Sequence, residues 1–483
     1  MLGKSKHPSR RTFLAGTLSS AVLSTGGNSF AQSVRGAAAL PPRVNVVIRN
    51  AYIMTMDSVL GDLVGGDVHF QNGEIIAVAK SLEAPGATVV DGRDMIVMPG
   101  FVDTHTHLWI AQMRGRFGDT PETVFFKMRN RLADGYLAQD IYAGTKLGAA
   151  ESVFAGITSC VDFFHNVRGP DYVDGALRAL KETGIRCRLL FGNSTRTPPD
   201  QTVDLALLEK LYGSWKTIVD GAPLTLGLAW RGPLGIVTPS VGGQPRPEFG
   251  AAKEDFAVAR RLGIPISVHI SGMTAKGQFA SLVQGNFLGA DVQLVHFSNA
   301  SAEDIRTAAQ AGSPVALTPL TELRVGYGIT QLSDYLAGGM KVGFGIDSNS
   351  LAGDANYFTV LKTFQGIEAG RQRNELAVKP RHLLEIATIG SARSIGMDNL
   401  IGSITPGKRA DIIMIDTRAL NLGMIVDDPS RLLVESAHPS NVDTVVIDGR
   451  ILKRDGKMTA LDVLQVVRDA NESITNVMER VRS

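Results

Sequence analysis

Two histidines close an apolar run near the start of the chain and could bind a metal ion. The run VMPGFVDTHTHLWI (97–110) places His105 and His107 one residue apart. Side chains alternate faces along a β-strand, so both rings would point to the same side. Neutral imidazole is the commonest metal ligand in proteins. The pair is therefore expected to form half of a metal site, the alternative being two core histidines with satisfied hydrogen bonds.

Three later residues could complete such a site. Each follows a short β-rich run: His269 in PISVHIS, His296 in VQLVHFSN and Asp347 in GFGIDSNS. With the histidine pair, His269 and Asp347 make a nitrogen and oxygen ligand set without thiolate, which suits one divalent ion that keeps a water molecule. Zinc is the first expectation, with iron, manganese or cobalt as alternatives. His296 is expected to polarise the reacting bond of the substrate; the alternatives are a further ligand, or a residue that only orients one by a hydrogen bond.

The candidate ligands stand at the ends of β-rich runs that alternate with helical segments. The eight runs are IVMPGFVDTHTH, GITSCVDFFH, IRCRLLFG, LTLGLAWRG, PISVHIS, VQLVHFS, PVALTPL and KVGFGIDS. Strands that alternate with helices build parallel sheets, and eight of them predict an α/β fold, the (β/α)8 TIM barrel, over residues 98–400. Active sites of such barrels lie at the carboxyl ends of the strands. Five of the nine histidines fall there.

Short strands flank the predicted barrel on both sides. They cover residues 42–97, where Asn-Gly and Asp-Gly pairs indicate hairpin turns, and they resume in residues 401–460. We therefore expect one small composite β-sandwich domain built from both chain ends. Residues 461–483 have helical spacing and are expected to pack on the outside as a C-terminal helix.

The composition excludes several functions. The 483 residues are 44% hydrophobic and 20% charged, which is typical of a globular protein. The net charge is only +2 and there is no basic block, so nucleic acid is not an expected partner. The two cysteines, Cys160 and Cys187, are too few for a disulfide scaffold or a cysteine-built zinc site. We expect two buried thiols, with a disulfide between neighbouring strands as the alternative.

The first 31 residues resemble a twin-arginine export signal. SRRTFLAG contains the pair Arg10 and Arg11, a weakly apolar stretch follows, and NSFAQ offers small residues at the spacing of a cleavage site. The alternative is a chance arginine pair in a tail. The apolar stretch is shorter than the ~20 residues of a membrane span, and none is expected in the mature form. The expectation is a periplasmic or secreted protein that uses the twin-arginine export machinery, with a homo-oligomer left open.

The ordered motifs resemble the amidohydrolase superfamily, in particular its cytosine-deaminase-like and triazine-hydrolase-like metal-dependent hydrolases. MPGFVDTHTH, SVHIS, LVHFSN, TPLTELRVGYG and GFGIDSN follow in the order of that family, and the resemblance covers nearly all of the mature chain. It implies that His105, His107, His269 and Asp347 bind one metal ion. It also implies that Asp347 accepts the proton of the attacking water and that His296 polarises the attacked C=O or C=N bond.

The sequence departs from that subgroup at Gly272. The resemblance implies a glutamate there, three residues after the fifth-strand histidine, as a proton shuttle. His165, at the end of VDFFH, and Glu322, just after the seventh run, are candidates for that catalytic role, structural hydrogen bonding being the alternative. The fourth run contains no lysine that could bridge a second metal, which favours a single ion.

The predicted function is hydrolysis of a non-peptide C–N bond in a small-molecule substrate by a metal-activated water. The bond would belong to an amide, urea, carbamate or cyclic amidine. The alternatives are a heterocycle deaminase, a metal-dependent dipeptidase and a non-catalytic barrel that only binds a ligand. Three side chains are expected to line the substrate pocket, or else to serve packing alone: Trp109, Gln112 and Trp230.

Overall fold

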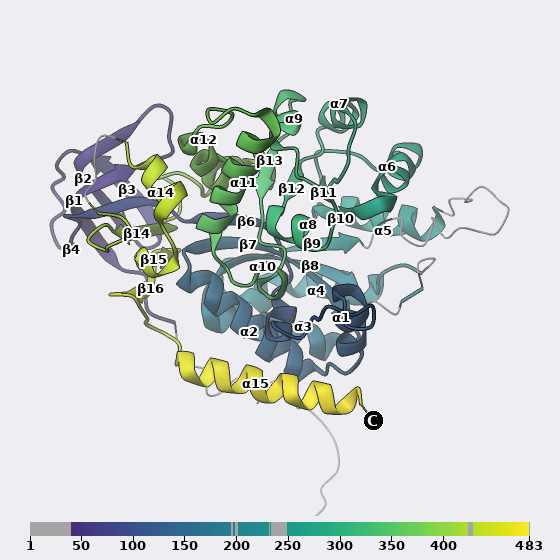
Figure 1. Cartoon of the computed structure of the whole chain (residues 1–483). Coiled ribbons are helices and arrows are strands. Elements are labelled where there is room, and N and C mark those ends of the chain that lie inside the picture. Colours follow the sequence, from purple (N-terminus) through teal and green to yellow (C-terminus); the bar gives the residue numbers. More distant parts are fainter. Residues whose placement is uncertain are drawn as a thin grey trace, which may run out of the picture. The chain divides into compact units, whose positions relative to one another are not determined.

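A computed structural model describes residues 40–194, 197–198, 201–230, 232, 249–423 and 428–482 of the chain (Figure 1). The predicted export signal, residues 1–31, lies outside the described residues. Within the described part, no helix combines the length and the apolar character needed to cross a membrane.

Eight parallel strands form the barrel, and they pair in chain order from β6 to β13. Each coincides with one of the runs expected from the sequence, β7 and β8 extending past the ends of theirs by two residues and one residue, which confirms the predicted α/β barrel. An isolated parallel bridge between Thr106 and Asp347 joins the first strand to the residues after the last. The strands are β6 (Phe101–Thr106), β7 (Ile157–Val167), β8 (Arg186–Asn193), β9 (Leu224–Trp230), β10 (Ile266–Ile270), β11 (Val292–His296), β12 (Val315–Leu317) and β13 (Val342–Phe344).

Helices follow the strands and bury their apolar faces against the barrel. Local signals in the sequence set several of their ends. α7 begins with a capping box in which Ser301 and Asp304 each accept a backbone N–H of the other, and α3 ends at Gly184 with φ +73°. The helices are α1 (Phe125–Asp134), α2 (Ala138–Phe154), α3 (Pro170–Thr183), α4 (Leu205–Val219), α5 (Gly250–Leu262), α6 (Ala275–Gln284), α7 (Ala302–Ala311), α8 (Pro319–Arg324), α9 (Leu332–Ala337), α10 (Asn349–Ala352), α11 (Tyr357–Gln372), α12 (Pro380–Glu385), α13 (Ser391–Ser394), α14 (Ser430–Ser436) and α15 (Val463–Arg480).

The long helix α15 lies along α2 on the outside of the barrel (Figure 1). Short helical turns supplement the α-helices, and one of them matters for the site. This is η1 (Leu108–Met113), a 3-10 turn that directly follows the histidine pair.

Strands from both ends of the chain form a second sheet, in the order β17-β16-β15-β14-β5-β1-β2-β3, with β4 paired to β1. Its central contact is the antiparallel pairing of β5 with β14, which joins the two ends of the chain. The expectation that both ends build one β unit is confirmed. The strands are β1 (Asn45–Met54), β2 (Asp62–Gln71), β3 (Glu74–Ala79), β4 (Thr88–Asp91), β5 (Met95–Pro99), β14 (Ile412–Asp416), β15 (Val442–Ile447), β16 (Arg450–Arg454) and β17 (Lys457–Met458).

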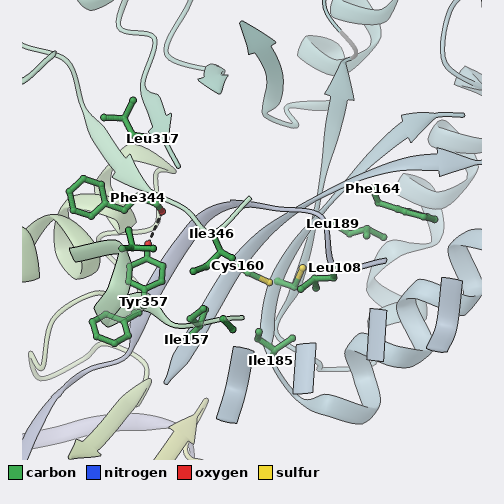
Figure 2. Packing of buried hydrophobic residues seen from close by; sticks show 14 of the residues in the cluster. Leu108, Ile157, Cys160, Phe164, Ile185, Leu189, Leu317, Phe344, Ile346 and Tyr357 are labelled. Atoms are coloured by element: carbon green, nitrogen blue, oxygen red, sulfur yellow. Dashed lines mark hydrogen bonds between the residues drawn. The ribbon is translucent and has the colours of Figure 1, made fainter. Parts of the chain in front are cut away.

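A continuous apolar core fills the space between the barrel strands and their helices (Figure 2). Cys160 and Cys187 lie opposite each other on β7 and β8 within it, and both are buried free thiols, as expected. The hydrogen bond with Cys187 and burial both raise the pKa of the Cys160 thiol. The hydroxyl of Tyr357 donates to the carbonyl oxygens of Phe344 and Val102, at 2.7 and 2.8 Å, so α11 is tied to strands on both sides of the closure.

A buried ion pair joins the barrel to the second sheet. Arg186 on β8 donates two hydrogen bonds to Asp411, from Nε at 2.6 Å and from Nη2 at 3.0 Å. Nη2 also lies 3.4 Å from a carboxylate oxygen of Asp448. Burial alone lowers the pKa of Arg186, but the two carboxylates outweigh burial and the pKa is raised. The two carboxylates therefore stabilise the Arg186 guanidinium, whose charge would be costly to bury in the barrel without them.

Replacing this arginine tests its contribution. Arg186→Met should lower the free energy of unfolding by about 3–5 kcal/mol, because Asp411 then stays buried without its cation. Denaturant unfolding followed by circular dichroism measures the change. Arg93→Met is the matched control, since Arg93 is an exposed surface arginine, and it should change stability by less than about 0.5 kcal/mol. Equal effects of the two substitutions would contradict the assigned role of Arg186.

Candidate metal centre and active site

Four of the predicted ligands converge at the carboxyl end of the barrel. His105 and His107 come from the end of β6, His269 from β10, and Asp347 from the turn after β13. Asp347 Oδ1 lies 3.1 Å from His105 Nε2 and 3.3 Å from His107 Nε2. His269 Nε2 lies 3.2 Å from His105 Nε2. Residues separated by more than 240 positions thus present their ligand atoms to one point.

The backbone closure of the barrel sets this geometry. The N–H of Asp347 donates to His105 O at 2.9 Å, and the N–H of His107 donates to Asp347 O at 2.6 Å. Asp347 adopts φ +64°, a left-handed conformation that Asp tolerates better than most residues. Gly345 permits the close approach, because a Cβ there would lie 2.8 Å from His105 O. The ligands are therefore held by main-chain hydrogen bonds as well as by their side chains.

The protonation of these groups fits a cation at their centre. Burial lowers the pKa of His105 to about 3 and that of His269 well below its usual range. His107 donates its Nδ1 proton to Phe163 O at 2.8 Å, which leaves Nε2 facing Asp347 Oδ1 at 3.3 Å. Burial opposes ionisation of Asp347, but its contacts with His105 and His107 outweigh burial and hold its pKa well below the usual range. Imidazole nitrogens and a carboxylate that face one another suit a divalent ion.

His296 is close enough to share that ion. One ligand atom each from His105, His269, His296 and Asp347 all lie within 4.8 Å of one another. The expected set contained His107 in place of His296. Both histidines therefore border the centre, and His107 is tied to it through its 3.3 Å contact with Asp347.

The other side of the His296 ring is fixed by a buried carboxylate. Nδ1 of His296 lies 3.3 Å from Glu322 Oε1 and 2.9 Å from Thr318 Oγ1. Glu322 also accepts from the Thr318 N–H at 2.8 Å and from the Thr330 hydroxyl. The structure thus places Glu322 behind His296, where it orients the ring. Its carboxylate does not reach the metal centre, as a proton shuttle that replaced the glutamate implied at position 272 would have to do.

The backbone at His296 is strained. His296 and Phe297 have φ values of +66° and +45°, a left-handed conformation that is costly for an aromatic residue. The strand therefore ends in an abrupt turn at this histidine. Such strain persists where the surrounding contacts over-determine the conformation, and it is concentrated at functional sites.

His165 borders the centre with both ring nitrogens engaged. Its ring lies edge-on to His107, with centroids 4.6 Å apart. Nδ1 donates to Phe163 O at 3.1 Å, and Nε2 accepts from Arg129 Nη1 at 2.8 Å. With this pairing the ring has no free lone pair for proton transfer and instead holds a guanidinium beside the site. Arg129 comes from α1, and nothing in the sequence pattern indicated it.

The three predicted pocket residues have different places. Trp109 is fully buried on η1 and packs edge-on against His165, with centroids 5.3 Å apart. Gln112 is also buried and donates to Asp140 O at 3.2 Å, which holds η1 against α2. Side chains alternate along β9, and the preceding residue, Ala229, packs with residues inside the barrel. Trp230 therefore points away from the barrel interior. Its ring packs on Phe256 and Phe287.

Tyr327 occupies the space beside Gly272 and was not expected from the sequence. Gly272 has φ +66°, and a Cβ there would lie 3.3 Å from the Tyr327 ring. Tyr327 packs edge-on to His296, with centroids 5.3 Å apart, and burial raises its pKa to about 12. A neutral phenol therefore lies beside the position at which the resemblance implied a carboxylate. An aromatic residue between two glycines, Gly326 and Gly328, was the only signal.

Comparison with known proteins agrees with this site. The model of the amidohydrolase family matches residues 96–452. A 5′-deoxyadenosine deaminase of Methanosarcina barkeri is 28% identical over 451 residues, which are 91% of this chain and 100% of the relative. A 5-methylthioadenosine/S-adenosylhomocysteine deaminase of Desulforudis audaxviator is 25% identical over 461 residues, with the same coverage.

Solved structures share the fold at lower identity. An adenosine deaminase from Xanthomonas campestris with bound zinc has a TM-score of 0.78 at 21% identity, covering 92% of this chain and 99% of its own. An atrazine chlorohydrolase from Arthrobacter aurescens in complex with zinc has a TM-score of 0.75 at 22% identity, covering 89% and 100%. With its barrel, its second sheet and its cluster of histidines and aspartate, the chain belongs to the amidohydrolase family and is a metal-dependent hydrolase that acts on C–N bonds.

Proposed function

We propose that this enzyme hydrolyses a non-peptide C–N bond of an amide, urea, carbamate or cyclic amidine, with one zinc ion held by His105, His107, His269 and Asp347. The observation that supports the proposal is the convergence of the three Nε2 atoms and the aspartate oxygen, at separations of 3.1–3.3 Å. This set has imidazole and carboxylate ligands and no thiolate, as in zinc sites that keep a position open for water.

The side chains around the centre have separate tasks. The bound ion supplies Lewis acidity and lowers the pKa of a water molecule to near neutrality. Asp347 is ionised and can accept a proton from that water and return it to the leaving nitrogen. His296, oriented through Nδ1 by Glu322, can direct its Nε2 at the oxygen or nitrogen where charge develops. Tyr327 keeps its proton and can donate a hydrogen bond beside His296.

Deamination of a purine nucleoside is the second candidate. The names of the relatives from Methanosarcina barkeri and Desulforudis audaxviator support it, because both are deaminases of adenosine-type compounds. Gly272 weighs against it, because the position implied for the shuttle carboxylate has no side chain and a Cβ there would lie 3.3 Å from the Tyr327 ring.

The products separate the two candidates. The purified enzyme, loaded with zinc, should release an amine and an acid or carbamate from a panel of small amides, ureas and carbamates. Liquid chromatography with mass spectrometry measures this. Release of ammonia from 5′-deoxyadenosine or methylthioadenosine at a higher kcat/KM than from any amide would instead establish the deaminase.

Location is a further proposal. We infer export by the twin-arginine route, because paired arginines, an apolar stretch and a small-residue cleavage site follow in order in residues 1–31. Cell fractionation should find the mature enzyme in the periplasm or medium and the Arg10→Lys/Arg11→Lys variant in the cytoplasm. Wild-type protein that stays in the cytoplasm with its first 31 residues intact would refute export.

Loss of a ligand should abolish metal binding. His105→Ala removes a buried ligand atom at the centre of the cluster, so the purified variant should hold less than about one tenth of the wild-type zinc, with a matching loss of activity. Inductively coupled plasma mass spectrometry measures the metal content. His69→Ala is the control, since His69 lies in the second sheet, and it should keep full occupancy. Full metal content in His105→Ala would show that the ion binds elsewhere.

Neutralising Glu322 should slow the reaction without emptying the centre. Glu322→Gln keeps the side-chain size and removes the charge that orients His296, so kcat should fall about 10–100-fold with little change in KM. Steady-state kinetics together with metal analysis tests this. An unchanged kcat, or loss of the metal, would contradict an orienting role.

A further inference from the structure

The amino-terminal end of the barrel, opposite the metal centre, contains a cavity of about 80 Å³. Residues that immediately precede two barrel strands, Pro265 and Pro314, line it, together with Ser267 and Gln293 from the strands themselves. Ile395, just after α13, lines another side. The cavity exceeds the ~30 Å³ that one water molecule occupies in the liquid, so it has room for a small polyatomic ligand.

A guanidinium group faces this cavity without an anionic partner. Arg188 Nη1 donates to Ile395 O at 2.9 Å, and Nε is buried with no hydrogen-bond partner among the described residues. In the same part of the chain, no carboxylate lies within ion-pair distance of it. Asp291 is the one acid among the lining residues, and Arg260 already binds its carboxylate at 2.8 Å.

The neighbouring arginine on the same strand has the carboxylate partners that Arg188 lacks among the described residues. Arg186, two residues earlier on β8, is buried against the two carboxylates Asp411 and Asp448. Burial lowers the pKa of Arg188 to about 10, and no carboxylate offsets this, yet the group stays charged at neutral pH. A half-buried cation without a counter-charge is only partly solvated, so an anion from solution would supply what a protein carboxylate supplies at Arg186.

The donor geometry of the guanidinium indicates which ligand fits. Nε is shielded and Nη1 donates to Ile395 O, so Nη2 is the donor left for a ligand. A planar guanidinium suits the oxygens of an oxyanion. The other polar side chains that line the cavity already donate elsewhere: Ser267 to Gln293 at 2.8 Å, Gln293 to Thr104 O at 3.1 Å and Ser394 to Ser391 O at 2.8 Å. The arginine is therefore the principal donor.

We propose that Arg188 binds a small oxyanion, of the sulfate, phosphate or carboxylate type, in this cavity. The anion neutralises the half-buried guanidinium and joins β8 to the turn after α13 through the arginine. This site is separate from the catalytic centre and does not depend on which C–N bond the enzyme cleaves. Its role is to stabilise the closed amino-terminal end of the barrel.

Thermal unfolding of the metal-loaded, full-length protein tests the site. Sodium sulfate is raised at constant ionic strength against sodium chloride, for the wild type and for Arg188→Met, which keeps the side-chain length without the charge. Sulfate stabilises folded proteins in general through exclusion from their surface, and both proteins share that effect. The wild type should show an additional rise in Tm on the order of 3 °C that Arg188→Met lacks. Arg93→Met, a surface control, should behave as the wild type.

Isothermal titration calorimetry tests anion binding at Arg188 even if Arg188→Met does not fold. Sulfate and acetate should each bind the wild type at one site per chain, and Arg188→Lys, which keeps the charge but not the planar guanidinium, should bind at least tenfold more weakly. Equal sulfate-dependent rises in Tm for wild type and Arg188→Met, or no measurable binding of either anion to the wild type, would overturn the proposal.

Discussion

The site depends on how the barrel closes. Parallel strands from β6 to β13 pair along the chain, but the last join is a single bridge between Thr106 and Asp347, formed by two backbone hydrogen bonds. Those bonds involve His105, His107 and Asp347 themselves. The main chain that completes the fold is therefore the main chain that sets the ligand positions, and the centre cannot form unless the barrel is closed.

Several buried charged groups have a partner within the protein. The carboxylate of Glu322 is satisfied by His296 and two threonines, and Asp411 is satisfied by Arg186. At the metal centre the ligand atoms face one another, and the guanidinium of Arg188 lines a cavity without a carboxylate partner among the described residues. These two sites lie at opposite ends of the barrel, where small ions can reach them.

The positions of the ligands could be predicted because they follow from strand ends. His269 and Asp347 end β-rich runs, and in a parallel barrel all such ends meet at one face. It was harder to predict to which face of a strand an individual side chain points. Trp230 also ends a strand, but its register turns it outward toward α5, and register within a strand cannot be read from a run of apolar residues on both faces. Arg129 and Tyr327 lie on a helix and a loop whose placement depends on tertiary packing, so their nearness to the site could not be seen in the sequence.

The pairing of β5 with β14 also bears on the order of events during synthesis. β5 ends at Pro99 and its partner begins at Ile412, so more than 300 residues must leave the ribosome before that contact can form. Arg186 likewise has to await Asp411 for its counter-charge. Barrel segments made early therefore remain without part of their packing until the residues around Ile412 have been synthesised. The contact that joins the two parts of the second sheet is thus a late step in folding, which follows synthesis of all the barrel strands between them.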